Sequence, residues 1–193
     1  MENSILFLLN EHKKALGDFE KYSQQTVLRI ANLIISCTEN GGIIYLCGNG
    51  GSAADCQHIA GEFVGRFRKK RHPLPAVSLT TDTSVLTCIG NDYNYDDIFV
   101  RQVQALIHGG DILWAFSTSG ASPNIIKAVK EAKKKGATII AFTGKTKSDL
   151  EKLSDGCLCS NTKLTSTAQE LHLLAYHIIC ELVDIKLMKV KHL

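Results

Sequence analysis

The stretch IIYLCGNGGSAADCQHIAGE, residues 43–62, joins a short apolar run, a glycine-rich turn and a run of helix-forming residues. The apolar run predicts a buried strand, and residues 53–67 predict the helix that follows it. A helix N-terminus after such a turn offers backbone N–H groups and a positive dipole end to an anion, with the Ser52 hydroxyl at the cap position. His58 and Glu62 are four residues apart, so we expect them side by side on one face of this helix.

The composition is that of a single globular domain spanning residues 1–193. Of the 193 residues, 45% are hydrophobic and 21% are charged. A net charge of +3 is too small to indicate a nucleic-acid partner. The longest apolar runs are too short to cross a bilayer and the N-terminus has no basic region typical of a secretory signal, so we expect a cytoplasmic protein without a membrane partner.

The seven cysteines are odd in number and lie mostly inside apolar runs. No Cys-x-x-Cys pair occurs, which argues against a structural zinc site built from cysteines. We expect buried, reduced thiols, in agreement with a cytoplasmic location.

Strand and helix patterns alternate after the first 40 residues. This alternation predicts an α/β fold, namely a three-layer αβα sandwich with a five-stranded parallel sheet and two leading N-terminal helices. We expect strands at 43–47, 76–79, 111–116, 137–142 and 156–160, a turn at 90–93, and helices at 3–20, 23–39, 53–67, 83–89, 96–107, 123–135, 148–153 and 164–187.

A second polar loop, STSGAS at residues 117–122, follows the third predicted strand. Ser122 is the predicted cap of the next helix, with Pro123 in the favoured first position. Its hydroxyls and backbone N–H groups suit the terminal oxygens of a phosphate monoester. Ligands in parallel α/β folds bind beyond the carboxyl ends of the strands, where both loops fall. One such loop could be a polar turn that only caps a helix, whereas two in one small domain indicate a binding site for a small phosphorylated ligand.

The first loop also matches the loose dinucleotide fingerprint through Gly48, Gly50 and Ala53. A dinucleotide-binding domain usually places an acidic residue about 20 residues further on, at the end of its second strand. The nearest candidate here, Asp82, lies much further along the chain. A nucleotide cofactor is therefore disfavoured.

Four side chains could together bind zinc: the imidazoles of His58 and His177, the carboxylate of Glu62 and the amide oxygen of Gln169. Taken singly, they are equally compatible with structural surface pairs, and His172 is an alternative imidazole on the last helix. Gln169 and His177 are eight residues apart, about 12 Å along an ideal helix. They reach one ion only if their side chains lean towards each other or come from different subunits.

Two further patterns concern residues expected at the protein surface or at a contact between subunits. The basic run from Arg66 to His72 is expected as a solvated helix end, with Arg66 as an alternative ligand for a substrate anion. The last predicted helix has apolar residues on nearly opposite sides, one set including Leu171 and Ile178 and the other including Tyr176. Such a helix must be covered on both sides, which indicates a second subunit.

Together these motifs resemble the phosphoheptose isomerases of the SIS (sugar isomerase) family. The likeness rests on GNGGS at 48–52 with His58 and Glu62, GND at 90–92, STSGAS at 117–122, and QELH at 169–172 with His177. It implies an aldose–ketose isomerase that converts sedoheptulose 7-phosphate to D-glycero-D-manno-heptose 7-phosphate through an enediol, the first step of bacterial surface heptose biosynthesis. It also implies a homotetramer with active sites between subunits, in which the helical extension at residues 1–40 serves oligomer packing.

The resemblance also implies roles for individual residues. Glu62 is the implied base that removes the carbon-bound proton, and His177 is the implied shuttle of protons between O1 and O2. One zinc ion per subunit is implied, surrounded by His58, Glu62, Gln169 and His177. The implied substrate-binding residues are Asn49, Gly50, Gly51, Ser52, Glu62, Arg66, Asn91, Asp92 and Gln169 around the sugar, and Ser117, Thr118, Ser119 and Ser122 around the phosphate.

Ser166 and Thr167 depart from the family pattern, which usually has Asp or Thr and then Arg at these two positions. An acidic substrate contact is therefore missing, which bears on sugar specificity. Two alternatives stay open: an isomerase of a different sugar phosphate, and a non-catalytic SIS-fold protein that binds a phosphosugar and regulates a protein partner.

Overall fold

The strands pair into one parallel sheet. In a computed structural model, which describes residues 2–189, the strand order is β2-β1-β3-β4-β5. The strands are β1 (Ile44–Cys47), β2 (Ala76–Ser78), β3 (Ile112–Ser117), β4 (Thr138–Thr143) and β5 (Gly156–Cys159). Cys47 pairs with Ala115, so the ends of β1 and β3 are neighbours. The direction of winding reverses between these two strands, and the crevice beyond their carboxyl ends is where such sheets bind ligands.

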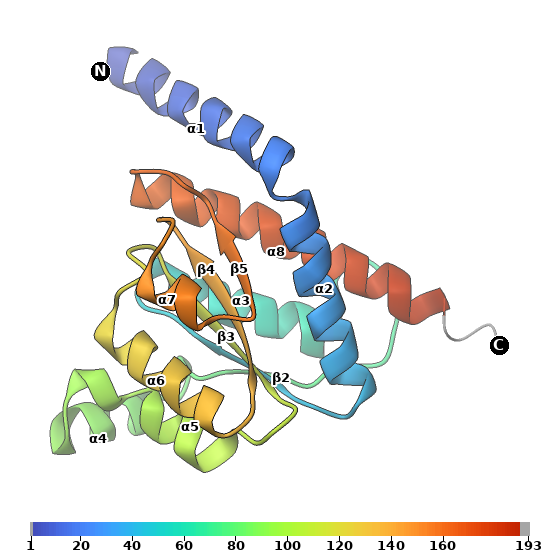
Figure 1. Ribbon diagram of the computed structural model, residues 1–193, viewed down its shortest axis with the longest axis vertical. Helices are drawn as coiled ribbons and strands as arrows, with labels where there is room; N and C mark the ends of the chain where they lie inside the picture. The colour runs from blue at the N-terminus through green and yellow to red at the C-terminus, as the bar shows by residue number, and fades with distance from the viewer. Residues whose placement is uncertain (1, 190–193) are drawn as a thin grey trace.

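Helices cover the sheet on both faces (Figure 1). Their bounds are α1 (Glu2–Tyr22), α2 (Gln24–Glu39), α3 (Gly51–Val64), α4 (Thr83–Asp92), the 3-10 helix η1 (Tyr95–Asp97), α5 (Val100–Leu106), α6 (Pro123–Lys134), α7 (Asp149–Leu153) and α8 (Thr165–Lys189). Within residues 2–189, no helix combines the length and the apolar character that a bilayer span requires.

Alternate strand residues face two separate helical layers. Ile44, Leu46 and Trp114 belong to the core that includes α2, α3 and α8. Tyr45 and Leu113 point the other way, into the core that includes residues of α4 to α7. Because both faces are covered, β1 and β3 are buried along their whole length. The predicted three-layer αβα sandwich is confirmed.

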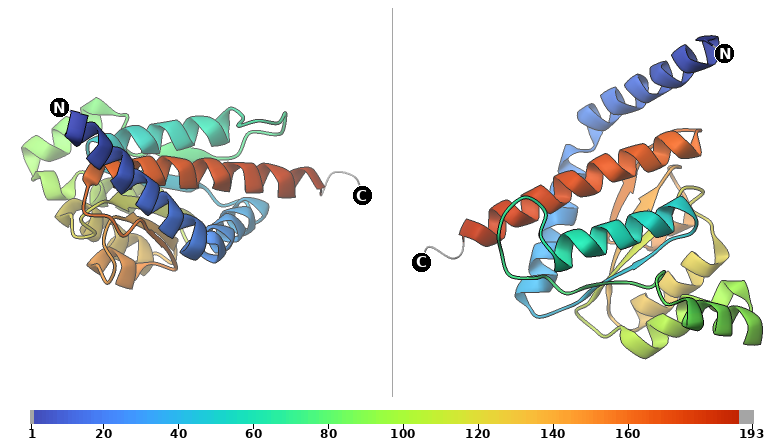
Figure 2. Two further views of the ribbon diagram at one scale, coloured as in Figure 1. Left: turned by 90° about the horizontal axis from the view of Figure 1, so that it is seen from above. Right: turned by 180° about the vertical axis from the view of Figure 1, so that it is seen from behind.

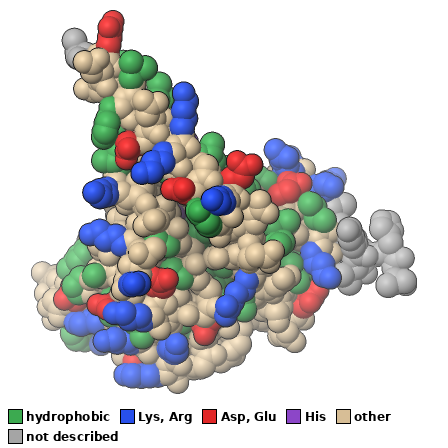
Figure 3. All heavy atoms as spheres, turned by 45° about the horizontal axis from the view of Figure 1, so that its top comes forward, with side chains coloured by type: hydrophobic (Ala, Val, Ile, Leu, Met, Phe, Trp, Pro, Cys, Tyr) green, Lys and Arg blue, Asp and Glu red, His purple; other side chains and the backbone are tan. Residues whose placement is uncertain are grey.

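Helix α1 contacts α8 and α2, and its N-terminal part projects away from the body of the molecule (Figures 1 and 2). Ala15 is its only buried residue. The side chains of Ile5, Leu6, Phe7, Leu8 and Leu9 are each 50–59% exposed. Figure 3 shows hydrophobic side chains along this projecting helix. The helix therefore carries an apolar surface that this single chain does not cover.

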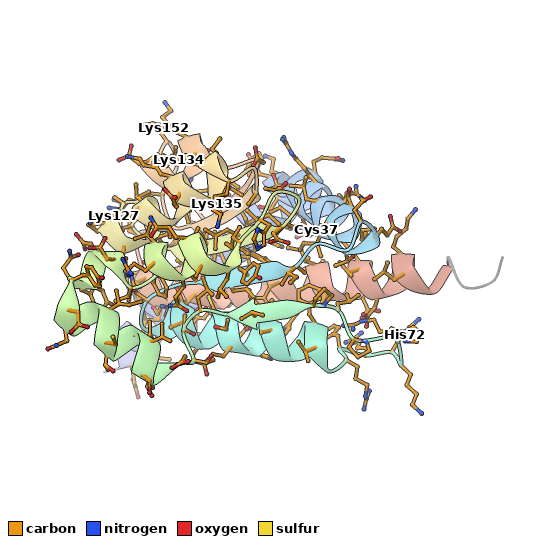
Figure 4. All side chains as sticks on the ribbon, turned by 90° about the horizontal axis from the view of Figure 1, so that it is seen from below. Cys37, His72, Lys127, Lys134, Lys135 and Lys152 are labelled. Atoms are coloured by element: carbon orange, nitrogen blue, oxygen red, sulfur yellow. The ribbon has the colours of Figure 1, made fainter. Side chains whose placement is uncertain are left out.

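Lysines mark the outer surface of the α5–α7 layer. Lys127, Lys134 and Lys152 point outwards from α6 and α7 (Figure 4). Lys135, just after α6, turns back instead, and its Nζ donates to the carbonyl oxygen of Val103 at 3.1 Å. Lys135 therefore stabilises the C-terminal end of α5.

Three local expectations were wrong. The turn expected at residues 90–93 is helical as far as Asp92, because Asp82 caps the N-terminus of α4 and Ile89 anchors it in the core. The helix expected at 96–107 is divided into η1 and α5. Ser52 is not the cap of α3, because Gly50 holds that position and the Ser52 side chain is buried in the first turn.

Helix α8 buries one broad face and not two opposite stripes. Leu171 and Tyr176, expected on different stripes, are both buried, whereas Leu173, Ile178 and Ile185 are 37–41% exposed. The reason is that α2 and α3 both lie against α8, so a wide arc of its surface is covered. The exposed apolar residues leave part of α8 uncovered in this single chain.

Candidate active site

The glycine-rich loop after β1 lies directly against α8. A Cβ atom added to Gly51 would lie 2.6 Å from Nε2 of Gln169, so the Gln169 amide packs directly against this glycine. Gln169 is therefore at the start of α3, next to the predicted anion cradle. Gly50 and Ser52 flank this contact in the cap and first turn of α3.

In the hydroxyl-rich loop after β3, residues 117–122, the serine hydroxyls contact one another. The Ser117 Oγ lies 2.9 Å from the Ser122 Oγ and 3.3 Å from the Ser119 Oγ. Gly120 has a φ of +66°, and an added Cβ would lie 2.3 Å from the Cβ of Ser148, so the turn requires glycine. Thr118, half-buried, completes the loop. The predicted phosphate-binding hydroxyls are therefore brought together at the N-terminus of α6.

Asn49 joins these two loops. Its side-chain Oδ1 accepts hydrogen bonds from Asn124 at 2.8 Å and from the Tyr95 hydroxyl at 3.0 Å. The first loop also borders a hollow of about 420 Å³ that reaches Thr87 and Gly90 on α4. This hollow connects the glycine loop to the helix that carries the GND motif.

His58, Glu62 and His177 meet across α3 and α8. One ligand atom from each of the three lies within 4.8 Å of the other two. The His58 Nε2 is 3.1 Å from the Glu62 Oε1, and the His58 and His177 ring centroids are 5.1 Å apart. Burial, and secondarily the nearby His58, lower the pKa of His177, which favours its neutral form. Two neutral imidazoles and one carboxylate are the protein ligands of many catalytic zinc sites, so these residues fit that metal.

Gln169 does not join this group within the chain. Helices α3 and α8 lie side by side and run in the same direction (Figure 2). Gln169 therefore meets Gly51 at the start of α3, whereas His177 meets His58 seven residues further on, about 10 Å along the helix. Of the two arrangements left open by the sequence, this geometry favours the one in which Gln169 and His177 of one zinc site come from different subunits.

The remaining predicted sugar-binding residues lie on the surface. The Asn91 Nδ2 donates to the Asp92 Oδ1 at 2.9 Å at the end of α4. This bond, and a second one from the Cys88 thiol, lower the pKa of Asp92. Arg66 is exposed beyond the end of α3 and forms no ion pair within residues 2–189. Within residues 2–189, no hydrogen bond joins Asn91, Asp92 or Arg66 to either loop, although the hollow beside Gly50 reaches Gly90, next to Asn91.

His172 is a core residue. It is fully buried, and its Nε2 donates to the carbonyl oxygen of Thr143 at 3.1 Å. Burial lowers its pKa to about 4. Of the two imidazoles considered on the last helix, His177 is thus the one that reaches His58 and Glu62.

The basic run after α3 was expected to be a solvated helix end, but one of its residues, Arg71, is buried. Arg71 turns back, and its Nε lies 2.5 Å from the Asp184 Oδ1, with both side chains buried. Its guanidinium also donates to the carbonyl oxygens of Glu62 and Phe63, at 2.7 and 2.8 Å. Arg71 therefore caps α3 and links it to α8 immediately beyond the His58–Glu62–His177 group.

Comparison with known proteins identifies this architecture. A sequence model of the SIS domain matches residues 9–144. The phosphoheptose isomerase of Burkholderia pseudomallei (strain 1710b) is 54% identical over 159 residues, which cover 82% of this chain and 81% of the relative. The chain belongs to the phosphoheptose isomerase family. Its family, its fold and its classification as a sugar-phosphate isomerase, all predicted from sequence motifs, are thereby confirmed.

Solved structures of phosphoheptose isomerases agree with this assignment. The enzyme of Neisseria gonorrhoeae has a TM-score of 0.89 at 40% identity, covering 95% of this chain and 98% of its own. That of Francisella tularensis has a TM-score of 0.90 at 34% identity, with coverages of 94% and 97%. The likeness therefore includes the N-terminal helices as well as the sheet.

Three polar residues around the site of this phosphoheptose isomerase family member were not found by sequence reasoning: Asp55, Asn124 and Tyr176. The Tyr176 hydroxyl lies 2.9 Å from the His58 Nδ1 and 3.5 Å from the Asp55 Oδ1. Asp55 precedes His58 by three residues, so the helical period places both on one face. That spacing was the available signal for Asp55, whereas Asn124 and Tyr176 read as ordinary helix positions.

Of the two positions that depart from the family pattern, Thr167 is buried and Ser166 is exposed.

Proposed function

We propose that this chain interconverts sedoheptulose 7-phosphate and D-glycero-D-manno-heptose 7-phosphate, the first step of bacterial surface heptose biosynthesis. The observation that carries this proposal is the meeting of Glu62, His177 and His58 from two helices, with ligand atoms within 4.8 Å. A carboxylate and a neutral imidazole at one point are the acid–base pair that an enediol mechanism requires.

The isomerisation moves one proton between carbons and one between oxygens. We assign to Glu62 the removal of the proton from C1 of the ketose and its return to C2 of the enediol. His177 then takes the proton of the O1 hydroxyl and gives it to O2. The lowered pKa of His177 keeps its ring neutral near pH 7 and able to accept this proton. Both protons return to the same sugar, so the isomerisation needs no co-reactant.

The phosphate and the chain of the sugar are held by the two loops at the end of the sheet. Ser117, Thr118, Ser119 and Ser122 would donate to the phosphate oxygens at the N-terminus of α6. The residues assigned to the sugar remain Asn49, Gly50, Gly51, Ser52, Glu62, Arg66, Asn91, Asp92 and Gln169. Because Arg66, Asn91 and Asp92 form no hydrogen bond with either loop within residues 2–189, a substrate contact from these three is proposed to come from a neighbouring subunit.

One zinc ion per subunit is part of the proposal. His58, Glu62 and His177 would hold it, with Gln169 of a neighbouring subunit as the fourth ligand. When bound, zinc would supply positive charge that stabilises the enediolate oxygens. Glu62 cannot act as base, and His177 cannot accept a proton, while the same side chain binds zinc, so both must exchange between these roles.

A single SIS domain that assembles into a homotetramer, with active sites between subunits, completes the proposal. The exposed apolar side chains of α1, from Ile5 to Leu9, support a packing role for residues 1–40. The exposed apolar residues of α8 support a second contact. We place the enzyme in the cytoplasm, in agreement with the seven free cysteines.

A turnover assay tests the function. Purified protein is incubated with sedoheptulose 7-phosphate, and heptose 7-phosphate is followed by NMR for wild type, Glu62→Gln and His177→Ala. Glu131→Gln, at a half-buried surface position, and His108→Ala, at an exposed one, are the matched controls. We expect turnover in wild type and both controls and loss in both site variants. Turnover of another ketose phosphate alone would point to a different sugar, and binding without any turnover would point to a regulator.

A further inference from the structure

The Tyr176 hydroxyl lies between His58 and Asp55, beneath the proposed metal site. Tyr176 is fully buried. Its oxygen is 2.9 Å from the His58 Nδ1 and 3.5 Å from the Asp55 Oδ1. The Asp55 Oδ2 is buried and has no hydrogen-bond partner among residues 2–189. The buried carboxylate therefore has Tyr176 as its hydrogen-bond donor in this part of the chain.

The hydroxyl has one proton, so it can donate to only one of these two neighbours. If it donates to the His58 Nδ1, the imidazole proton is on Nε2 and points at Glu62. If it donates to Asp55, the His58 Nδ1 carries the proton and donates to the tyrosine oxygen. Only the second arrangement leaves the Nε2 lone pair free for a metal ion.

The position of Asp55 favours the second arrangement. Its Oδ1 lies 3.5 Å from the Tyr176 oxygen and accepts, whereas the His58 Nδ1 can donate to that oxygen as well as accept from it. The edge-on packing of the His58 and Tyr176 rings, with centroids 5.5 Å apart, fixes the direction in which Nε2 points. That direction is towards the Glu62 Oε1, 3.1 Å away.

We infer that Tyr176 and Asp55 are positioning residues that hold His58 in the tautomer and orientation that bind a metal ion. The inference rests on the proposed metal centre of His58, Glu62 and His177. It gives a chemical role to a tyrosine and a carboxylate that belong neither to the proposed metal ligands nor to the proposed substrate-binding residues.

Metal affinity tests this role directly. Zn²⁺ affinity is measured by competition with a chromophoric chelator for wild type, Tyr176→Phe and Asp55→Asn. Tyr45→Phe is the matched control, because Tyr45 is also a buried residue and its hydroxyl donates to the carbonyl oxygen of Leu106 at 3.1 Å. We expect a loss of affinity of about 10–100-fold in both site variants, the usual effect of removing an outer partner of a metal ligand, and none in the control.

A second measurement reads the tautomer itself. In the zinc-loaded wild type, ¹⁵N NMR of the His58 ring should show a proton on Nδ1, protected from solvent exchange, and Tyr176→Phe should lose that protection. Wild-type affinity in Tyr176→Phe, an equal loss in Tyr45→Phe, or an unprotonated Nδ1 would each overturn the inference. Absence of zinc binding in wild type would overturn the metal centre and this inference together, whereas the turnover assay tests the isomerase independently.

Discussion

Asn49 and Asn124 exchange two amide hydrogen bonds, although 75 residues separate them. The Asn124 Nδ2 donates to the Asn49 Oδ1 at 2.8 Å, and the Asn49 Nδ2 donates to the Asn124 Oδ1 at 3.0 Å. Asn49 lies in the loop after β1 and Asn124 in the first turn of the helix after β3. The pair therefore fixes the glycine loop relative to the hydroxyl loop. The amide of Asn49, which the family resemblance implied for the sugar, is engaged in this junction.

We predict that Asn124→Ala uncouples the two loops. Asn124 is 1% exposed, so the substitution leaves the Asn49 amide without its buried partner. The free energy of unfolding should fall by about 1–3 kcal/mol, the usual cost of an unsatisfied buried polar group. The KM for the sugar phosphate should rise more than kcat falls, because ground-state positioning is lost. Asn40→Ala, an exposed amide that donates to Ser36, is the control and should change neither quantity.

Gly120→Ala should damage phosphate binding specifically. The left-handed φ of +66° disfavours alanine, and the added Cβ would overlap the Ser148 side chain that caps α7. Moving the loop displaces the Ser119 and Ser122 hydroxyls, so we expect inorganic phosphate to inhibit at least about tenfold less well, equivalent to about 1.4 kcal/mol of binding. Phosphate inhibition of turnover is the measurement.

The control is Gly17→Ala in the exposed middle of α1, where an added Cβ meets nothing within 4 Å. There alanine should raise the free energy of unfolding by about 0.5–1 kcal/mol through its better helix propensity. Unchanged phosphate inhibition in Gly120→Ala would remove the hydroxyl loop from the proposed site.

The loops and the His58–Glu62 pair could be predicted because their signals are local. Glycine and serine clusters between apolar runs mark loop positions, and the His58–Glu62 spacing follows from the helical period. The parallel sheet then places both loops at one edge. Such reasoning needs no knowledge of which helices touch, and it located His58 and Glu62, whereas the role of His177 was implied by the family resemblance.

The contacts between distant helices could not be predicted in this way. The parallel packing of α3 on α8 brings Tyr176 to His58 and Asp184 to Arg71, and it takes Gln169 to Gly51. Nothing in the local pattern of α8 distinguishes these positions, because its residues are apolar on most sides. The basic run after α3 looked solvated for the same reason: the partner of Arg71 lies 113 residues away.

We predict a pH-dependent loss of stability caused by His172. Its pKa is about 4 in the folded protein, below its unfolded value of 6.5, because burial disfavours the cation. The unfolded chain therefore binds a proton that the folded chain does not, and stability falls as the pH drops from about 6.5 towards 4. Between pH 7 and pH 5 the expected loss from this group is about 2 kcal/mol.

His172→Phe should abolish this contribution, as measured by urea unfolding at pH 7 and pH 5. The ring can pack against Phe142 as the imidazole does, and Ser160 still donates to the Thr143 carbonyl at 2.9 Å. His108→Phe, at an exposed position, should retain the wild-type difference between the two pH values. An equal pH effect in wild type and His172→Phe would show that His172 titrates normally.

The last prediction concerns the Arg71–Asp184 pair, whose side chains are 5% and 0% exposed. Asp184→Ala should lower the free energy of unfolding by about 3–5 kcal/mol, because it leaves a buried guanidinium unpaired. The double variant Arg71→Met/Asp184→Leu should be less destabilised than Asp184→Ala, since it buries no charge. Glu131→Ala, which breaks an exposed pair with Lys134, should cost at most about 1 kcal/mol. If urea unfolding shows Asp184→Ala to be as mild as that surface variant, the pair is solvated and does not hold α3 on α8.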